Sequence, residues 1–137
     1  MRLIKEIADE KIRTIAVDFD GTLCEREKFP AIGKPKQAMI DWLKAQKQNG
    51  KRLILWTCRE GEDLKQAIEW SAEQGLTFDT HNENIPGFPV ETRKVVADIY
   101  IDDRACVPIY DDKASEIEPC DDETKEEKEP LKGREQI

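Results

Sequence analysis

Two aspartates stand two residues apart in the segment Asp18-Phe19-Asp20-Gly21-Thr22. Carboxylates at this spacing, on a turn that contains a glycine, can point into one cavity while backbone N–H groups of the turn meet a phosphate. One carboxylate can then attack phosphorus, and the other can protonate the leaving oxygen and later activate water. The alternative is a plain turn at the end of a strand, because Asp and Gly favour turns.

Other polar residues that could take part in such chemistry follow later apolar runs. Thr57 follows Leu-Ile-Leu-Trp, and the pair Asp102-Asp103 follows Ile-Tyr-Ile, with Lys94 a short distance upstream of that pair. Thr57 carries little weight alone, because Thr ends many strands. A strand that serves only packing has no need to end in polar residues, so the positions together favour chemistry at the strand ends.

The hydrophobic pattern predicts strands and helices in alternation. The predicted strands span 14–18, 52–57, 76–80 and 98–102, and the predicted helices span 2–9, 35–48, 62–73 and 90–97. This order is typical of an α/β fold with parallel strands and right-handed crossovers. We predict a single Rossmann-like domain of three layers, with a mainly parallel sheet of about four to five strands. Sites in such sheets form at the carboxyl ends of the strands.

The charge distribution divides the chain in two. The net charge is −8, and residues 111–137 alone hold 11 acidic and 5 basic side chains. We predict a folded domain over 1–110 and an acidic tail over 111–137 that is disordered or loosely helical.

Composition also excludes several classes of protein. The acidic balance does not indicate nucleic-acid binding, and no apolar run approaches the roughly 18–20 residues of a membrane span. The charged start does not resemble a secretory signal. Four cysteines without a CxxC pair and a single histidine argue against a zinc site. We therefore expect a cytoplasmic protein with reduced thiols.

The segment Asp18–Thr22 is similar to the first motif of the haloacid dehalogenase superfamily, DxDGT, and matches it at every position. The later motifs correspond to Thr57 (second), Lys94 with Arg93 as a weaker candidate (third), and Asp102-Asp103 (fourth). They occur in the superfamily's order over residues 14–104, so the domain over 1–110 resembles its catalytic domain. Receiver domains use similar residue types in a different order.

The resemblance implies a Mg²⁺-dependent phosphomonoesterase that passes through a phospho-aspartyl intermediate on Asp18. Asp20 would be the acid and base, Thr57 would bind a phosphoryl oxygen, and Lys94 would neutralise phosphate charge. The implied Mg²⁺ ligands are Asp18, the backbone carbonyl of Asp20, Asp102 and Asp103. Converging carboxylates require a cation, and oxygen ligands select Mg²⁺. Two alternatives stay open: a phosphate-binding or regulatory protein with little turnover, and a phosphotransferase.

The spacing between the motifs predicts a capless member of the superfamily. Caps are inserted after the first motif or between the second and third, and neither 22–52 nor 57–94 is long enough to hold one. We expect an open site unless a flap at 24–34 or an oligomer partner covers it. The identity of its phosphorylated substrate stays open.

Four residues close to the motifs are candidate substrate contacts. Gly21 and Thr22 belong to the first motif, whereas Arg59 and Arg104 each lie just past a later one. The two arginines could clamp an anionic substrate, or they could pair with neighbouring acidic residues.

Three cysteines also follow motifs closely, namely Cys24, Cys58 and Cys106. If they gather near the site, their oxidation could inhibit an enzyme. Small buried thiols are the simpler interpretation.

Overall fold

The computed structural model describes residues 12–110 and 115–119, which form two compact units that divide after Asp103. The helix expected at 2–9 lies outside the described residues. Neither helix in the described part of the chain has the length and apolar content that a membrane crossing needs.

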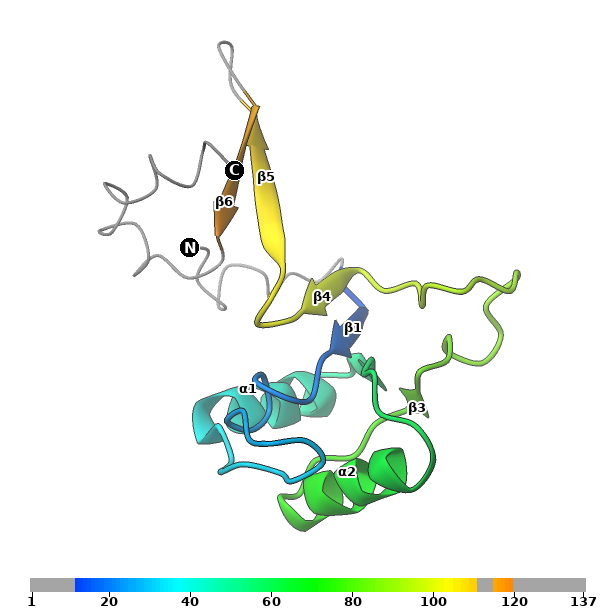
Figure 1. The fold of residues 1–137 in the computed structure, drawn as a ribbon. Helices are drawn as coiled ribbons and strands as arrows, with labels where there is room; N and C mark the ends of the chain where they lie inside the picture. The colour runs from blue at the N-terminus through cyan, green and yellow to red at the C-terminus, as the bar shows by residue number, and fades with distance from the viewer. Residues whose placement is uncertain (1–11, 111–114, 120–137) are drawn as a thin grey trace, which may run out of the picture. The chain divides into compact units, whose positions relative to one another are not determined.

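The first unit is built around a sheet of four parallel strands (Figure 1). Its elements are β1 (Thr14–Val17), α1 (Gln37–Gln48), β2 (Arg52–Leu55), α2 (Gly61–Glu73), β3 (Thr80–His81) and β4 (Ile99–Ile101). The strands lie in the order β3-β2-β1-β4, and every pairing is parallel. The predicted α/β fold with a parallel sheet is therefore confirmed.

The register of the sheet aligns the ends of three neighbouring strands, β2, β1 and β4. Val17, the last residue of β1, is level with Leu55 of β2 and with Ile101 of β4. The residues that come next along each strand therefore leave the sheet at the same edge.

β3 is shorter and lies later than the strand expected at 76–80. Asp79 comes just before it, and its backbone N–H donates to the Leu53 carbonyl at 2.8 Å. Its carboxylate accepts from the Leu53 N–H, also at 2.8 Å. The side chain thus supplies the acceptor that a strand carbonyl would otherwise supply, and regular pairing begins one residue later.

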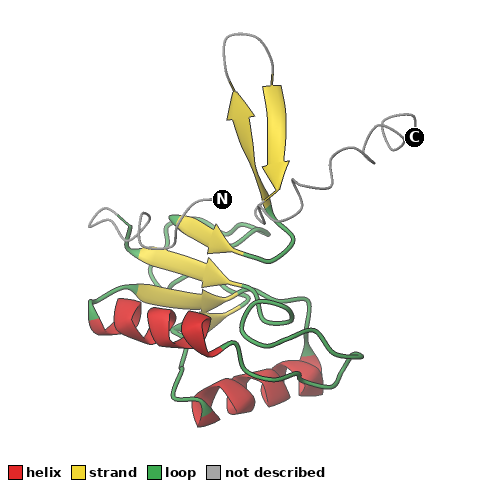
Figure 2. Cartoon of the chain, turned by 90° about the vertical axis from the view of Figure 1, so that its left-hand side faces the viewer, coloured by secondary structure: helices red, strands yellow, loops and turns green. Residues whose placement is uncertain are grey.

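Both helices cover one face of the sheet (Figure 2). Side chains alternate between the two faces of a strand, so Ile15 and Val17 of β1 point to the helices, whereas Ala16 points away. The main core cluster joins these strand residues to Ile40 and Leu43 of α1, and to Ala67 of α2.

An irregular segment, residues 82–98, covers the other face. Val95 is 2 % exposed and packs with Ala16 and Ile54. The chain moves in one direction from β1 to β3 and then reverses to place β4 beyond β1. Because crossovers are right-handed, this reversal puts the last connection on the face opposite the helices.

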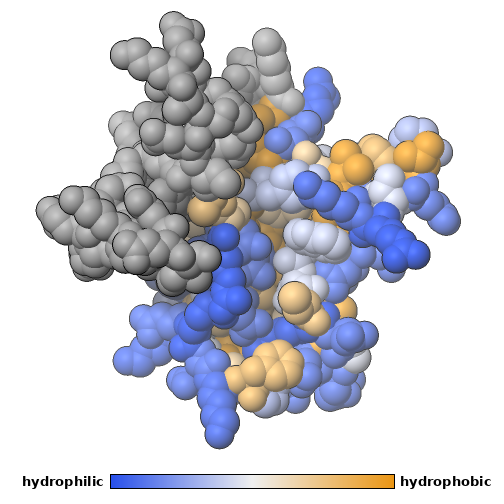
Figure 3. Space-filling model, turned by 45° about the horizontal axis from the view of Figure 1, so that its top comes forward, coloured by the Kyte–Doolittle hydropathy of each residue, from blue (hydrophilic) through white to orange (hydrophobic). Residues whose placement is uncertain are grey.

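The short helix expected at 90–97 does not form. Side chains in this segment hydrogen-bond to the backbone in place of helical carbonyls: Asn84 Oδ1 accepts from the Val96 N–H at 2.6 Å, and Thr92 Oγ1 donates to the Lys94 carbonyl at 2.6 Å. Such local bonds compete with helix formation. The third layer is therefore an irregular segment, over which apolar side chains gather on the surface (Figure 3).

The second unit contains an antiparallel strand pair, β5 (Cys106–Tyr110) and β6 (Ser115–Pro119), in which Cys106 is level with Pro119. Residues 115–119 thus form a strand where we expected disorder or loose helix. Residues 120–137 of the expected tail lie outside the described residues.

Candidate active site

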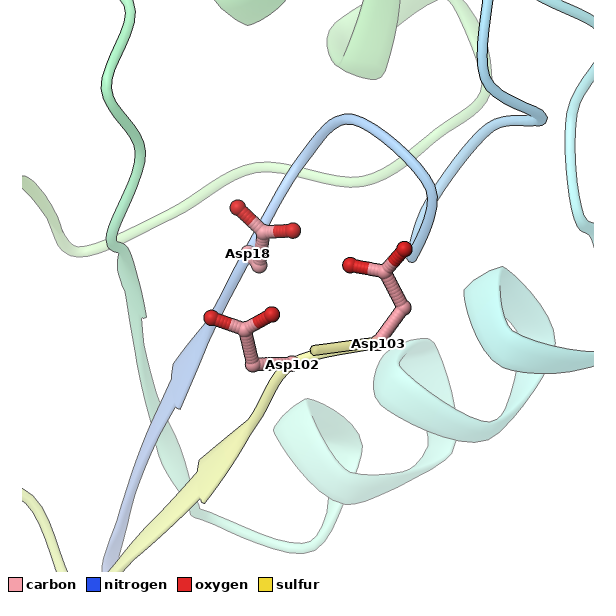
Figure 4. Close-up of side chains that lie close together, drawn as sticks. All are labelled: Asp18, Asp102 and Asp103. Carbon is pink, nitrogen blue, oxygen red and sulfur yellow. The ribbon is translucent and has the colours of Figure 1, made fainter. Parts of the chain in front are cut away.

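Three aspartates meet at the carboxyl edge of the sheet. Asp18 follows β1, and its backbone N–H donates to the Ile101 carbonyl of β4 at 2.9 Å. Asp102 and Asp103 follow β4 directly. Each of the three carboxyl groups offers an oxygen within 4.8 Å of the others, and the side chains surround one space (Figure 4). This edge is also the point where the connections change face, which is where α/β sheets place ligands.

Thr22 ties the two halves of this cluster together. Its hydroxyl donates to Asp18 Oδ2 at 3.2 Å and accepts from the Asp103 N–H at 3.1 Å. The side chain is 4 % exposed. Thr22 stays a predicted substrate contact, and in the structure its hydroxyl holds the ends of β1 and β4 in place.

Gly21 is required by both conformation and space. Its φ of +88° belongs to the region that favours glycine. A Cβ at this position would also collide with Oδ2 of Asp103. Any side chain here would therefore displace Asp103 from the cluster.

The cluster disfavours a charged Asp18. Burial is the largest cause and the charge of Asp102 the next, and the pKa of Asp18 rises from 3.8 to about 7. Asp103 acts in the same direction, whereas hydrogen bonds from the Phe19 backbone and the Thr22 hydroxyl oppose the shift without cancelling it. A cation among the three carboxylates would offset this repulsion.

The donor set fits a hard divalent cation. Asp18, Asp102 and Asp103 offer only oxygen atoms, and these are close enough to share one ion. Such ligands suit Mg²⁺ better than zinc or copper. The backbone carbonyl of Asp20 stays a predicted further ligand.

Two basic residues next to the cluster were missed by the sequence analysis. Arg26 Nε and Nη2 donate to the two Asp103 oxygens at 3.0 and 3.2 Å. Lys36 Nζ donates to the Gly21 carbonyl at 2.9 Å. Neither contact could be predicted from the sequence, because only the fold of the loop after the first motif brings Arg26 and Lys36 back to that motif.

Asp20 is engaged by a buried arginine. Arg59 Nε donates to Asp20 Oδ2 and Arg59 Nη2 to Asp20 Oδ1, both at 2.8 Å. The arginine is 1 % exposed. The sequence leaves open whether Arg59 clamps a substrate or pairs with a neighbouring acidic residue; in the structure its guanidinium is buried against Asp20.

Thr57 lies at the same edge, just beyond β2, where the Trp56 N–H donates to the Val17 carbonyl at 2.9 Å. The Thr57 hydroxyl accepts from the Arg59 N–H at 3.1 Å, so its own proton is left to donate. Asn82 fixes this turn, because its Oδ1 accepts from the Thr57 N–H at 2.8 Å and its Nδ2 donates to the Arg59 carbonyl at 3.3 Å. Asn82 has a φ of 57°, a conformation that Asn tolerates.

Lys94 does not join the cluster in this structure. Its ammonium lies 4.7 Å from the centroid of the Tyr100 ring. Because the expected helix is absent, Val95 points into the sheet and its neighbour Lys94 is exposed. Arg93 is exposed as well, and Arg104 belongs to the second unit.

Comparison with known proteins found one informative relative. No model of a known protein family matches the chain, and no curated protein matches it either. A solved structure of a conserved protein from Bacteroides thetaiotaomicron is 46 % identical, with a TM-score of 0.62. The similarity covers 69 % of this chain and 78 % of the bacterial one. The chain belongs to the family of that protein.

Within the described residues, neither of the two intervals in which the resemblance would place a cap contains a folded cap. The interval 22–52 forms a loop and α1, and the interval 57–94 forms α2, β3 and part of the irregular segment. The cluster is therefore bordered by loops of the first unit itself.

The cysteines of this family member differ in exposure. Cys24 is buried, and burial raises the pKa of its thiol. Cys58 and Cys106 are exposed, and Cys106 lies in the second unit. The interpretation as a small buried thiol therefore fits Cys24 but not Cys58 or Cys106.

Proposed function

We propose that the protein is a Mg²⁺-dependent phosphohydrolase that uses Asp18 as its nucleophile. The supporting observation is the position of Asp18: it follows a buried strand and faces Asp102 and Asp103 with oxygen atoms within 4.8 Å. Carboxylates held this close raise each other's energy, which favours a site that works with a cation bound.

The chain's own residues divide the chemistry. An Asp18 oxygen forms a bond to phosphorus while the bond from phosphorus to the leaving oxygen breaks, and Asp20 gives that oxygen a proton. Asp20 then takes a proton from a water molecule that attacks the phosphorus of phospho-Asp18, which releases phosphate and restores the carboxylate. In this proposal the Thr57 hydroxyl and the Lys36 ammonium, which donates to the Gly21 carbonyl, bind phosphoryl oxygens.

Asp18, Asp102 and Asp103 would hold the metal. When bound, Mg²⁺ supplies charge that lets an anionic phosphate approach an anionic nucleophile. Thr22 would keep Asp18 and Asp103 at a fixed separation, because its hydroxyl bonds to both.

The test is turnover of a generic aryl phosphate and a panel of phosphorylated metabolites and phosphopeptides with Mg²⁺. Asp18→Asn removes the nucleophile, so activity should fall by more than about 1,000-fold. The control is Asp41→Asn on the exposed side of α1, where the carboxylate accepts from Gln37 Nε2 at 2.9 Å. Equal activity in Asp18→Asn and Asp41→Asn would show that Asp18 is not the nucleophile.

A second candidate is a phosphate-binding protein with little turnover. Two ion pairs favour it. Arg26 donates to both oxygens of Asp103, and Arg59 donates to both oxygens of Asp20. Carboxylates engaged in this way are less available to bind a metal or to transfer a proton. This candidate predicts saturable binding of inorganic phosphate by calorimetry in the presence of Mg²⁺, with no release of product from any ester of the panel.

A further inference from the structure

We propose that Arg59 is a positioning residue that fixes the Asp20 carboxylate, and that the flap at 24–34 acts on Asp20 through Arg59. This inference rests on the proposed function, in which Asp20 transfers protons. It assigns a role to a buried side chain that takes no direct part in that chemistry.

The contact between Arg59 and Asp20 fixes direction as well as distance. Nε and Nη2 each donate to a different carboxylate oxygen at 2.8 Å. A planar guanidinium bound in this way allows the carboxylate little rotation. The Asp20 side chain keeps 26 % of its surface exposed, whereas the Arg59 side chain keeps none. Arg59 therefore holds Asp20 from the protein side and leaves it open on the other.

Arg59 is in turn held from two sides. Its guanidinium carbon lies 5.1 Å from the ring centroid of Phe19 and 5.0 Å from that of Phe29. Phe19 is fully buried in the core, whereas Phe29 belongs to the flap and is 60 % exposed. Arg59 Nη2 also donates to the Ala31 carbonyl of the flap at 3.4 Å. A displacement of the flap would thus change the packing and hydrogen bonding of the group that orients Asp20.

The backbone of Arg59 is fixed by the turn that carries Thr57. The Arg59 N–H donates to the Thr57 hydroxyl and its carbonyl accepts from Asn82. One residue therefore links the turn after β2, the flap and Asp20.

A purely structural role explains this arrangement poorly. Buried ion pairs add little stability compared with apolar packing, and Arg59 Nη1 is buried without a hydrogen-bond partner. An unpaired buried donor lowers stability further. A side chain held at this cost is better explained by what it does to Asp20.

The kinetic test uses Arg59→Met and Arg59→Lys in the full chain with Mg²⁺. Arg59→Met should lower kcat by about 10- to 100-fold, because a misplaced proton-transfer group reduces the rate by this order. KM and the calorimetric Mg²⁺ affinity should change less than about 3-fold, because Asp18, Asp102 and Asp103 are untouched. Arg59→Lys keeps the charge without the two-point contact and should lie between wild type and Arg59→Met.

Phe29→Ala tests the flap without removing the buried charge. It should lower kcat by about 3- to 10-fold and have no further effect in the Arg59→Met background. The matched controls are Phe88→Ala and Arg52→Met, both exposed and outside the site, and both should retain the wild-type kcat.

A double variant links the effect to Asp20. If Arg59 acts through Asp20, Asp20→Asn with Arg59→Met should be no slower than Asp20→Asn alone. If the losses of kcat in the two single variants multiply in the double variant, or if Arg59→Met keeps the wild-type kcat, the inference is overturned. Either result would leave Asp18 as the proposed nucleophile. Absence of Mg²⁺-dependent turnover in the wild type would overturn the proposed function, and this inference with it.

Discussion

Asp18 is harder to ionise than an ordinary aspartate because it is partly buried and faces two further carboxylates. The position of its carboxylate is set by neighbouring residues that take no part in the proposed reaction. Thr22 bonds to Asp18 and to the backbone of Asp103, and Gly21 leaves the space that the Asp103 carboxylate occupies. A carboxylate kept in a repulsive site lowers the stability of the metal-free protein, and that loss is measurable.

The pH dependence of stability should report this effect. The pKa of Asp18 is about 7 in the folded chain and near 3.8 when unfolded, so the folded state binds the extra proton between these values. The contribution of Asp18 to the free energy of unfolding is therefore complete below the lower value and lost as pH rises through the upper one. Without metal, Asp18→Asn should gain on the order of 2 kcal/mol over wild type between about pH 5 and about pH 8.

Urea unfolding in chelator at several pH values measures that difference. Asp41→Asn is again the control, because Asp41 is exposed on α1 and does not belong to the cluster. A constant difference between Asp18→Asn and wild type across the range would contradict the raised pKa.

At the scale of elements, the order β3-β2-β1-β4 creates the site. Equal register at the ends of β1 and β4 makes Asp18 and Asp102 neighbours. The reversal of direction places the segment 82–98 on the face opposite the helices, where Val95 anchors it. This anchoring also turns Lys94 to the Tyr100 ring.

Val95→Ala should therefore destabilise the first unit by on the order of 2 kcal/mol, because it removes a fully packed side chain from the second core cluster. Val96→Ala is the matched control: Val96 is 40 % exposed, and its truncation should change stability by less than about 0.5 kcal/mol. Chemical denaturation measures both. Equal effects would show that the segment is not anchored by Val95.

For the whole molecule, a bound cation and the folded state should stabilise each other. The first unit brings its three carboxylates together only when β1 and β4 pair, so the unfolded chain offers no comparable site. Mg²⁺ at about 100 times its Kd should raise the free energy of unfolding by about 2.7 kcal/mol.

Thermal unfolding of the full chain over a Mg²⁺ series checks this linkage. Asp102→Asn removes a carboxylate from the cluster and should weaken the shift in Tm, whereas Asp41→Asn should preserve it. A Tm that does not respond to Mg²⁺ would argue against a cation site at the cluster.

Much of the fold follows from local pattern. The apolar runs at 14–17, 52–55 and 99–101 form strands, and the periodic segments form both helices close to their predicted ends. The spacing of the aspartates also indicated the acidic cluster, because residues that end parallel strands share one edge of the sheet. These features depend on contacts near in sequence or on the general rules of parallel sheets.

The contacts that complete the site depend on which loops fold back to the sheet edge. Arg59 reaches Asp20 across 39 positions and Arg26 reaches Asp103 across 77, and the hydrophobic pattern carries no record of such pairings. Lys94 fails to reach the cluster because tertiary bonds from Asn84 and Tyr100 replace the predicted helix. The sequence by itself therefore determined the strand-end aspartates and the chemistry open to them. Tertiary structure alone decided which basic side chains contact these aspartates, because long-range packing and not local preference sets the direction of a loop side chain.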